Sequence, residues 1–461
     1  MAVSEKTPLI KSGFQQPAIR PVVLARTVTL FGALIEGWDG AVWGLTLAPI
    51  TAEFGLRISD IGMFAALPHL LGPLGMILAG ILMDRHGRKR ALIASYVCCA
   101  AGLGIVASAI SFRQLLFGRV VMALGFNAGT TAASVYLAEL SPCNYRGSIV
   151  ASEEILLSTG KAASTICWYA LQSSEYGSWR PFLGLAALSP CIAILGLLIL
   201  PVPESPRYLL MAGRTDEALE VMMSIEPCNQ KDTVDALQLW QREEEAVRLS
   251  SSAPGGRLCE LFQERGFWLS AGTWFFKECS GQIVITNLMI YILSARGMSE
   301  QLATLWFTFA AVLRTLALLL PVFYFIDKVG RRVSLMASAI LCSLCMAAAA
   351  SVTRMKHHSG ILLALSFTGF MASFSLGYGP VAWVSSELLP NAHRGKAFAL
   401  SRVPSALVSS FIVLVSPSLV YSSPATLYFT LSAINLAAML FFTTIPETTR
   451  MTLEQVRKAV R

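Results

Sequence analysis

Three short charged phrases occur twice in this chain, in the same order, and this repeat limits the possible folds more than any other feature. The first copy of each phrase lies about 243 to 248 positions before the second. The pairs are Asp84–Arg90 with Asp327–Arg332, Glu139 to Arg146 with Glu387 to Arg394, and Pro203–Arg207 with Pro446–Arg450. Because each phrase follows an apolar stretch, we predict that one half of the protein is built twice.

The composition predicts that these two halves lie in a membrane. Hydrophobic residues make up 54% of the 461 residues and charged residues only 14%, against about 25% charged residues in soluble domains. Lipid can solvate apolar helix faces that a soluble protein could not expose to water. A doubled, apolar chain is typical of a transporter. The net charge of +8 does not indicate a nucleic-acid partner, because Lys and Arg occur mostly in short loops between apolar runs.

The sequence carries no pattern that indicates catalysis or a bound cofactor. Its ten cysteines show neither paired nor metal-binding spacing, and most lie inside apolar runs. We also find no nucleotide-binding loop and no constellation of nucleophile and base in the sequence. We therefore predict that the protein is not an enzyme and has no metal site and no cofactor.

Twelve apolar segments are long enough to cross a bilayer, which takes about 20 residues as a helix. They predict an all-α membrane protein of two six-helix bundles, 22–201 and 266–445. A polar cytosolic linker, 202–265, separates the bundles and contains short helices near 214–225 and 233–249. The chain begins with a disordered segment, 1–21, and ends with a tail, 446–461. The twelve predicted spans are 22–49, 61–83, 91–111, 115–138, 149–171, 181–201, 267–293, 303–326, 333–353, 360–388, 398–418 and 424–445.

Charge in the loops predicts that both termini lie in the cytosol. Basic loops alternate with loops that are mixed or poor in Lys and Arg, and an even number of spans returns the chain to its starting side. Residues 1–21 lack the apolar core of a cleavable signal peptide. The segment Glu5–Ile10 fits the acidic dileucine pattern of sorting signals. We therefore expect the protein in the plasma membrane, or in a lysosomal, vacuolar or endosomal membrane if sorting adaptors recognise that pattern.

Several motifs together resemble the major facilitator superfamily, and most of all its sugar porter (hexose transporter) branch. The resemblance covers nearly the whole chain and implies a carrier that works by alternating access as a monomer, with a small-molecule substrate and protons as partners. The motifs are Gly80 to Arg90, Gly118-Arg119, Tyr136–Pro142 running to Arg146-Gly147, Pro203–Leu210, Gly379-Pro380 to Pro390 with Trp383 and Glu387, and Pro446 to Glu454.

Charged residues at the cytosolic ends of the spans are the candidate gates. Carboxylates there can pair with arginines or with positive helix N-termini, and the resemblance implies a latch between the bundles that favours the outward-facing state. Simple anchoring of the topology by Lys and Arg is the structural alternative. The candidate gating residues are Asp84, Arg88, Glu139, Arg146, Asp327, Arg331, Glu387 and Arg394.

Asp39 and Arg119 are the candidate proton-coupling pair. Asp39 lies in the middle of the first span, where a carboxylate is costly and indicates a function, and Arg119 begins the fourth span. An acid and an arginine at these places couple sugar to protons in the branch that the chain resembles. A static buried ion pair is the alternative.

The candidate substrate residues differ from those of the family that the chain resembles. Charges of both signs occupy places where the resemblance predicts amides, so these charges either pair with one another or bind an ionic substrate. The candidates are Glu154, Lys161, Lys277, Glu278, Asn287, Tyr291, Arg314 and Trp383.

These residues predict a secondary active transporter, with proton-coupled symport of a sugar or a similar small polar solute as the favoured function. One alternative is a proton-coupled carrier of organic carboxylates or cations. A second is a nutrient sensor on a carrier scaffold that does not transport, which would be expected to have a long cytosolic signalling tail.

Overall fold

The fold is seen in a computed structural model, which describes residues 21–142, 146–171, 179–225, 262–321, 330–355, 360–381, 384–385, 388–389 and 394–447. The regular elements of the described residues are all helices. The first half holds α1 (Pro21–Phe54), α2 (Ile58–Leu70), α3 (Gly72–His86), α4 (Arg88–Ala107), α5 (Phe112–Glu139), α6 (Arg146–Leu171) and α7 (Trp179–Ile199). The second half holds α12 (Arg265–Cys279), α13 (Gln282–Ser294), α14 (Glu300–Leu320), α15 (Arg331–Arg354), α16 (Gly360–Ser375), α18 (Arg394–Ser422) and α19 (Pro424–Phe442).

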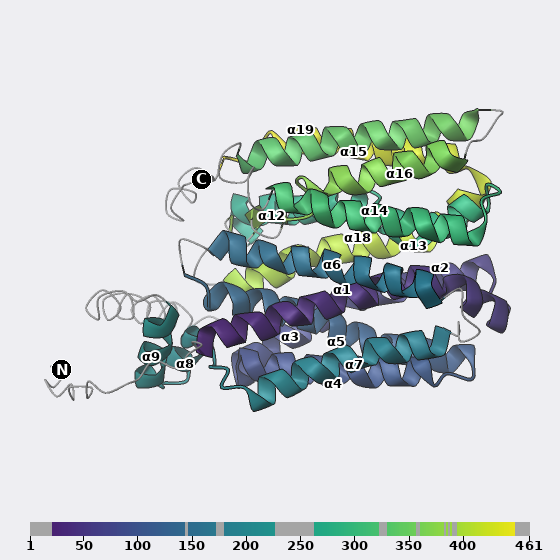
Figure 1. Ribbon diagram of the computed structural model, residues 1–461. Helices are drawn as coiled ribbons and strands as arrows, with labels where there is room; N and C mark the ends of the chain where they lie inside the picture. Colours follow the sequence, from purple (N-terminus) through teal and green to yellow (C-terminus); the bar gives the residue numbers. More distant parts are fainter. Residues whose placement is uncertain are drawn as a thin grey trace, which may run out of the picture.

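The two halves form two bundles of long helices that lie side by side (Figure 1). Within the first bundle α4 packs on α5 and α7, and α1 packs on α6. Within the second bundle α15 packs on α16 and α19, and α12 packs on α18. The bundles contact each other through α6 with α14, α2 with α18 and α1 with α13. The interior between them is therefore bordered by helices from both halves.

Two spans are each made of two helices in line. The pair α2 and α3 crosses the membrane together as Ser59–His86. The pair α12 and α13 breaks at Gly281, which has a φ of +101° that favours glycine. Asn435 of α19 donates a 2.9 Å hydrogen bond to the Ser280 carbonyl at this break. With each pair counted as one span, these helices follow the order of the twelve predicted segments.

Two short helices follow the first bundle at one end of the molecule. They are α8 (Pro206–Met211) and α9 (Thr215–Ile225), and α9 contacts α1. Figure 1 shows them beside the beginning of α1. The sequence predicted α9 over nearly the same residues, whereas the helix predicted at 233–249 and the segment 1–20 lie outside the described residues.

In the first bundle, α1 and α6 cross so closely that only glycine fits. A Cβ atom on Gly160 would lie 1.7 Å from the Leu34 carbonyl oxygen, and one on Gly37 would lie 1.8 Å from the Leu157 carbonyl oxygen. Both obstacles are backbone atoms, which cannot rotate away. The two helices therefore bring their backbones into direct contact near the middle of the membrane.

In the second bundle, hydroxyl groups line the contact between α12 and α18. The Ser270 hydroxyl lies 2.8 Å from the Ser385 hydroxyl and donates to the Ser401 hydroxyl at 3.2 Å. All three side chains are buried. Buried hydroxyls need such partners, because an unpaired polar group in an apolar interior is costly.

The repeated phrases have a structural role at the beginning of α4. Glu204 accepts hydrogen bonds from the backbone N–H groups of Arg88, at 2.9 Å, and of Lys89, at 3.2 Å. Gly87 precedes the helix with a φ of +92°. A carboxylate here satisfies N–H groups that have no partner inside the helix and interacts favourably with the helix dipole.

The second copy of the phrases builds the same arrangement at α15. Glu447 accepts hydrogen bonds from the backbone N–H groups of Arg331, at 3.0 Å, and of Arg332, at 3.2 Å. Gly330 precedes this helix with a φ of +102°. The sequence repeat is therefore also a repeat of backbone geometry and of hydrogen bonding.

Candidate functional site

A carboxylate in the membrane interior connects the two bundles. Glu154 of α6 accepts a hydrogen bond from Arg314 of α14, with 2.9 Å between Arg314 Nη2 and Glu154 Oε1. Its other oxygen lies 3.9 Å from the Nζ atom of Lys277 in α12. One carboxylate thus faces two cations, and both cations belong to the opposite bundle.

Arg314 is almost completely enclosed, and only 3% of its surface is exposed. Its Nε and Nη1 atoms have no hydrogen-bond partner among the described residues. The guanidinium lies 5.3 Å from the ring centre of Phe374, and the Ser375 hydroxyl donates to the Arg314 carbonyl at 2.9 Å. The arginine is therefore held firmly while part of its hydrogen-bonding capacity stays unused by the described groups.

Lys277 and Arg402 both lie close to the indole of Trp274. The cation-to-centroid distances are 4.8 Å for Lys277 and 4.7 Å for Arg402, within the range of cation–π attraction. The Trp274 Nε1–H donates to the Ser385 hydroxyl at 2.7 Å, and Lys277 donates to the Gly379 carbonyl at 3.4 Å. The second bundle therefore presents two cations around one fixed aromatic ring.

Three further charged residues belong to the same region. Lys161 of α6 reaches α1, because a Cβ on Gly40 would lie 3.2 Å from its Cε atom. Glu278 of α12 lies in the electrostatic field of Lys277 and Lys161, and Glu153 accepts from the Ser134 hydroxyl at 3.0 Å. We call the seven charged residues the interior cluster: Glu153, Glu154, Lys161, Lys277, Glu278, Arg314 and Arg402.

Arg119 lies in a separate place inside the first bundle. Only 4% of its surface is exposed, its Nε donates to the Phe64 carbonyl at 2.8 Å, and its guanidinium stacks 3.8 Å from the ring centre of Trp43. Trp43 follows Asp39 by four residues on α1, which is about one helical turn. The Asp39 backbone is helical, and its side chain lies outside the described part.

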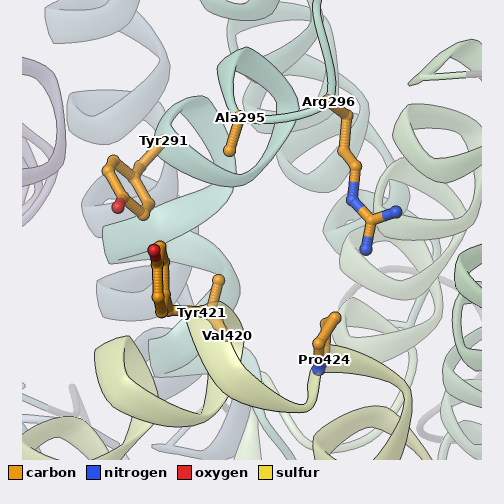
Figure 2. A pocket seen from close by; sticks show the side chains of 6 residues that line it. All are labelled: Tyr291, Ala295, Arg296, Val420, Tyr421 and Pro424. Atoms are coloured by element: carbon orange, nitrogen blue, oxygen red, sulfur yellow. The ribbon is translucent and has the colours of Figure 1, made fainter.

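Tyr291 faces an outer pocket rather than the interior cluster. The pocket has a volume of about 460 Å³, and 42% of the Tyr291 surface is exposed. Figure 2 shows Tyr291 and Tyr421 on one side of it and Arg296 on the other. Asn287, one turn before Tyr291, lies where α13 packs against α1, since a Cβ on Gly44 would lie 3.5 Å from its Cα. Trp383 lies outside the described residues.

Comparison with known proteins identifies the family. The model of the family described as "Sugar (and other) transporter" matches residues 25–459. The chain belongs to this family. A probable polyol transporter 4 of Arabidopsis thaliana is 30% identical over 92% of this chain and 82% of its own. An arabinose-proton symporter of Bacillus subtilis is 25% identical, over 95% of this chain and 94% of its own.

A solved structure confirms the predicted fold of this member of the sugar transporter family. The structure of the proton:xylose symporter XylE superimposes with a TM-score of 0.83, at 21% identity, over 95% of this chain and 99% of that one. XylE belongs to the major facilitator superfamily. The predicted all-α fold of twelve spans in two bundles is therefore confirmed, and the family match together with the apolar helices confirms the predicted multi-pass membrane protein.

The candidate gating residues lie at helix ends, as far as they are described. Arg88 pairs with Glu139 through both carboxylate oxygens, at 2.9 and 3.0 Å, and Ser205 also donates to Glu139. This pair lies within the first bundle, whereas the sequence predicted contacts across the bundles. For Arg146 and Arg394 only the backbone is described, and Asp327 and Glu387 lie outside the described residues.

Burial changes the pKa of a carboxylate close to this pair. It raises the pKa of Glu204, although backbone N–H donors from Ser205, Lys89 and Arg88 oppose the shift. Asp84, which begins the repeated phrase, interacts electrostatically with Arg88. The first copy of the phrases therefore forms one connected charged region.

Several residues in the interior of the protein were not selected from the sequence. Arg402 was not selected, although an arginine in the apolar span 398–418 meets the same criterion that selected Arg314. Glu153 lies next to Glu154 and could have been found in the same way. The hydroxyl group of Ser385 next to Trp274 gave no signal, because serine is common in transmembrane helices.

Proposed function

We propose that this protein is a proton-coupled symporter that moves a small polyhydroxylated solute by alternating access. The proposal is supported by the family membership and by the two bundles with charged groups between them. It is also supported by relatives that are described as a polyol transporter and an arabinose-proton symporter. The solute would bind between the bundles, where the interior cluster brings polar groups from α6, α12, α14 and α18 together.

The observation that carries the proton coupling is the position of Arg119. Its guanidinium is buried in the first bundle against Trp43, one turn from Asp39 on α1. An arginine keeps its charge even when buried, so a nearby carboxylate is stabilised in its ionised form and can release or accept a proton as that contact changes. In this proposal Asp39 binds the transported proton, and Arg119 favours its release.

The Asp39→Asn variant tests this role in proteoliposomes with a pH gradient. A 1:1 symporter can accumulate its solute about tenfold for each pH unit. The variant should lose accumulation and retain exchange of labelled for unlabelled solute. Glu53→Gln is the matched control, because Glu53 is also an α1 carboxylate paired with an arginine, Arg180, but lies at the outer helix end. Accumulation by Asp39→Asn at the unchanged level would refute the role.

The cytosolic charges would act as gates in the same cycle. We propose that Asp84, Arg88, Glu139 and their repeat counterparts stabilise the state in which the cytosolic side is closed. Asp84→Asn should then increase cytosolic access to the interior, measured as the labelling rate of single cysteines by a membrane-impermeant reagent applied from each side. An unchanged ratio of the two labelling rates would contradict this gating role.

We also propose an orientation in the membrane and a monomeric state. The basic loops favour cytosolic termini with α8 and α9 on the cytosolic side, and the carrier would act as a monomer. Protease access to residues 202–265 in sealed vesicles of known orientation tests the topology. Cleavage only from the outer side of cells would overturn it.

A further inference from the structure

The interior cluster offers more hydrogen-bond donors than its own acceptors use. Arg314 donates from Nη2 to Glu154, but its buried Nε and Nη1 atoms have no partner among the described residues. A buried charged donor without a partner is costly, and native proteins rarely leave one unsatisfied without a function. The missing acceptor is expected to come from the solute.

Two of the three carboxylates of the described cluster are already engaged or shared. Glu154 serves both Arg314 and Lys277, and the second contact is long, at 3.9 Å. Glu153 is turned toward the Ser134 hydroxyl of α5 in its own bundle. The described cluster thus contains the four cations Lys161, Lys277, Arg314 and Arg402 against three carboxylates.

From this geometry we infer that the transported solute is a hydroxylated carboxylate, in other words a sugar acid rather than a neutral sugar or polyol. This inference rests on the proposed function and specifies its substrate class. A carboxylate can accept from one of the two unused nitrogens of Arg314 together with the second hydrogen of Nη2, which is the planar, forked geometry that guanidinium groups favour. The hydroxyl groups of a neutral sugar could accept from the same nitrogens, but they would bring no negative charge to a described cluster in which the cations outnumber the carboxylates by four to three.

The same face of α6 offers a partner for a hydroxyl group. Ser158 follows Glu154 by one helical turn and precedes Lys161 by three residues, so the three share a face. The buried Ser158 hydroxyl has no hydrogen-bond partner among the described residues. A solute that combines a carboxylate with hydroxyl groups would therefore use both the arginine and this serine.

Charge balance gives the inference a consequence that a neutral sugar does not share. A singly charged carboxylate that moves with one proton carries no net charge across the membrane. A neutral sugar that moves with one proton carries one positive charge, and its accumulation changes about tenfold for each 60 mV of membrane potential. The response to voltage therefore separates the two substrate classes.

The first test measures equilibrium binding to the purified full-length protein by isothermal calorimetry. D-gluconate and D-glucitol are the probes, because they share a six-carbon hydroxylated skeleton and differ in the carboxylate. Wild-type protein should bind gluconate at least about tenfold more tightly, as expected for a charge-assisted hydrogen bond pair. Equal or tighter binding of glucitol would overturn the inference.

Substitutions test whether Arg314 is the source of the preference for gluconate over glucitol. Arg314→Gln should reduce the preference for gluconate to about onefold, and Arg354→Gln is the matched control, because Arg354 also contacts an aromatic ring but lies exposed at the end of α15. If the single variant fails to fold, the double variant Glu154→Gln/Arg314→Gln removes both members of the 2.9 Å ion pair. A gluconate preference that persists in whichever of these variants folds would overturn the inference.

Transport assays separate a failure of the inference from a failure of the proposed function. Proteoliposomes with a pH gradient and a valinomycin-set potential should accumulate gluconate to the same extent at 0 and −120 mV. Voltage-driven accumulation of glucitol or glucose without gluconate uptake would overturn the inference and support proton-coupled symport. Gluconate uptake that does not depend on the pH gradient would contradict proton coupling, but it would not contradict the proposed binding of an anionic solute.

Discussion

Glu204 and Glu447 have the same role at the beginnings of α4 and α15, whereas Glu154 has a different role in the membrane interior. Each of the first two carboxylates accepts hydrogen bonds from two backbone N–H groups at a helix beginning. Glu154 instead reaches cations of the opposite bundle. The repeated residues thus fix each bundle internally, and unrepeated residues interact between bundles.

The helix contacts inside the two bundles differ in a similar way. The α1–α6 contact depends on Gly37 and Gly160, whereas the α12–α18 contact carries the hydroxyl groups of Ser270 and Ser401. The first contact is closed by backbone against backbone, and the second is polar. The difference teaches that a duplicated fold keeps its helix order while the two interiors acquire different chemistry. Four sets of substitutions test this comparison, starting with the largest expected effect.

Gly160→Ala should be the most damaging, because its Cβ would overlap the Leu34 carbonyl oxygen at 1.7 Å. We expect a loss of about 4 kcal/mol of unfolding free energy, measured by thermal unfolding in detergent. Gly104→Ala is the control, since no atom lies within 4 Å of a Cβ there. Ser401→Ala, at the polar contact between α12 and α18, should lower the free energy of unfolding by only about 1 kcal/mol. Equal losses for Gly160→Ala and Gly104→Ala would show that the α1–α6 contact is looser than described.

Arg314→Gln should destabilise the protein by about 3 kcal/mol, because it removes one partner of a buried ion pair. The loss is at the lower end of the expected range because Lys277 remains 3.9 Å from Glu154. Glu154→Gln/Arg314→Gln should recover most of the stability in the same melting assay. No recovery in the double variant would mean that the ion pair is not the source of the effect.

Glu204→Ala and Glu447→Ala should cost similar amounts, about 1–2 kcal/mol each, because both remove the acceptor at a helix beginning. Glu204→Gln should cost less than Glu204→Ala, since burial already disfavours the charged form of this carboxyl. Chemical unfolding of the two alanine variants side by side measures the symmetry. A difference above about 1 kcal/mol would contradict the structural equivalence of the two helix beginnings.

Ser134→Ala should have the smallest effect, about 1 kcal/mol. It removes the hydroxyl that donates to Glu153 at 3.0 Å and leaves the cross-bundle pair intact. The expected signature is a slightly lower melting temperature with an unchanged affinity for the solute. A large loss of solute binding would instead make Glu153 part of the binding site.

The fold could be predicted from sequence because its signals are long and redundant. Apolar spans such as 91–111 and 333–353 are each followed or preceded by repeated charged phrases, so errors in one boundary do not alter the helix count. The breaks within α2–α3 and α12–α13 were not predicted. Hydropathy averages over a whole span, and the positive φ of Gly281 depends on its local contacts.

The interior site could be predicted only in part. An ionisable residue in an apolar span is an unambiguous signal, and it selected Glu154, Lys277 and Arg314, which the structure brings together. Their pairing could not be deduced, because it depends on how α6 and α14 are placed across the boundary between bundles. Tyr291 was expected among the same residues, but it lies one helical turn beyond Asn287 and lines the outer pocket.

The ion pair between Glu154 and Arg314 bears on the speed of the carrier. A motion that parts α6 from α14 must separate these opposite charges in a medium of low dielectric, where their attraction is strong. In the proposed cycle, a bound anionic solute can replace Glu154 as the partner of Arg314 and lower that barrier, whereas the unloaded protein has no substitute. Return of the empty carrier then becomes the slow step, and solute on the far side of the membrane accelerates turnover.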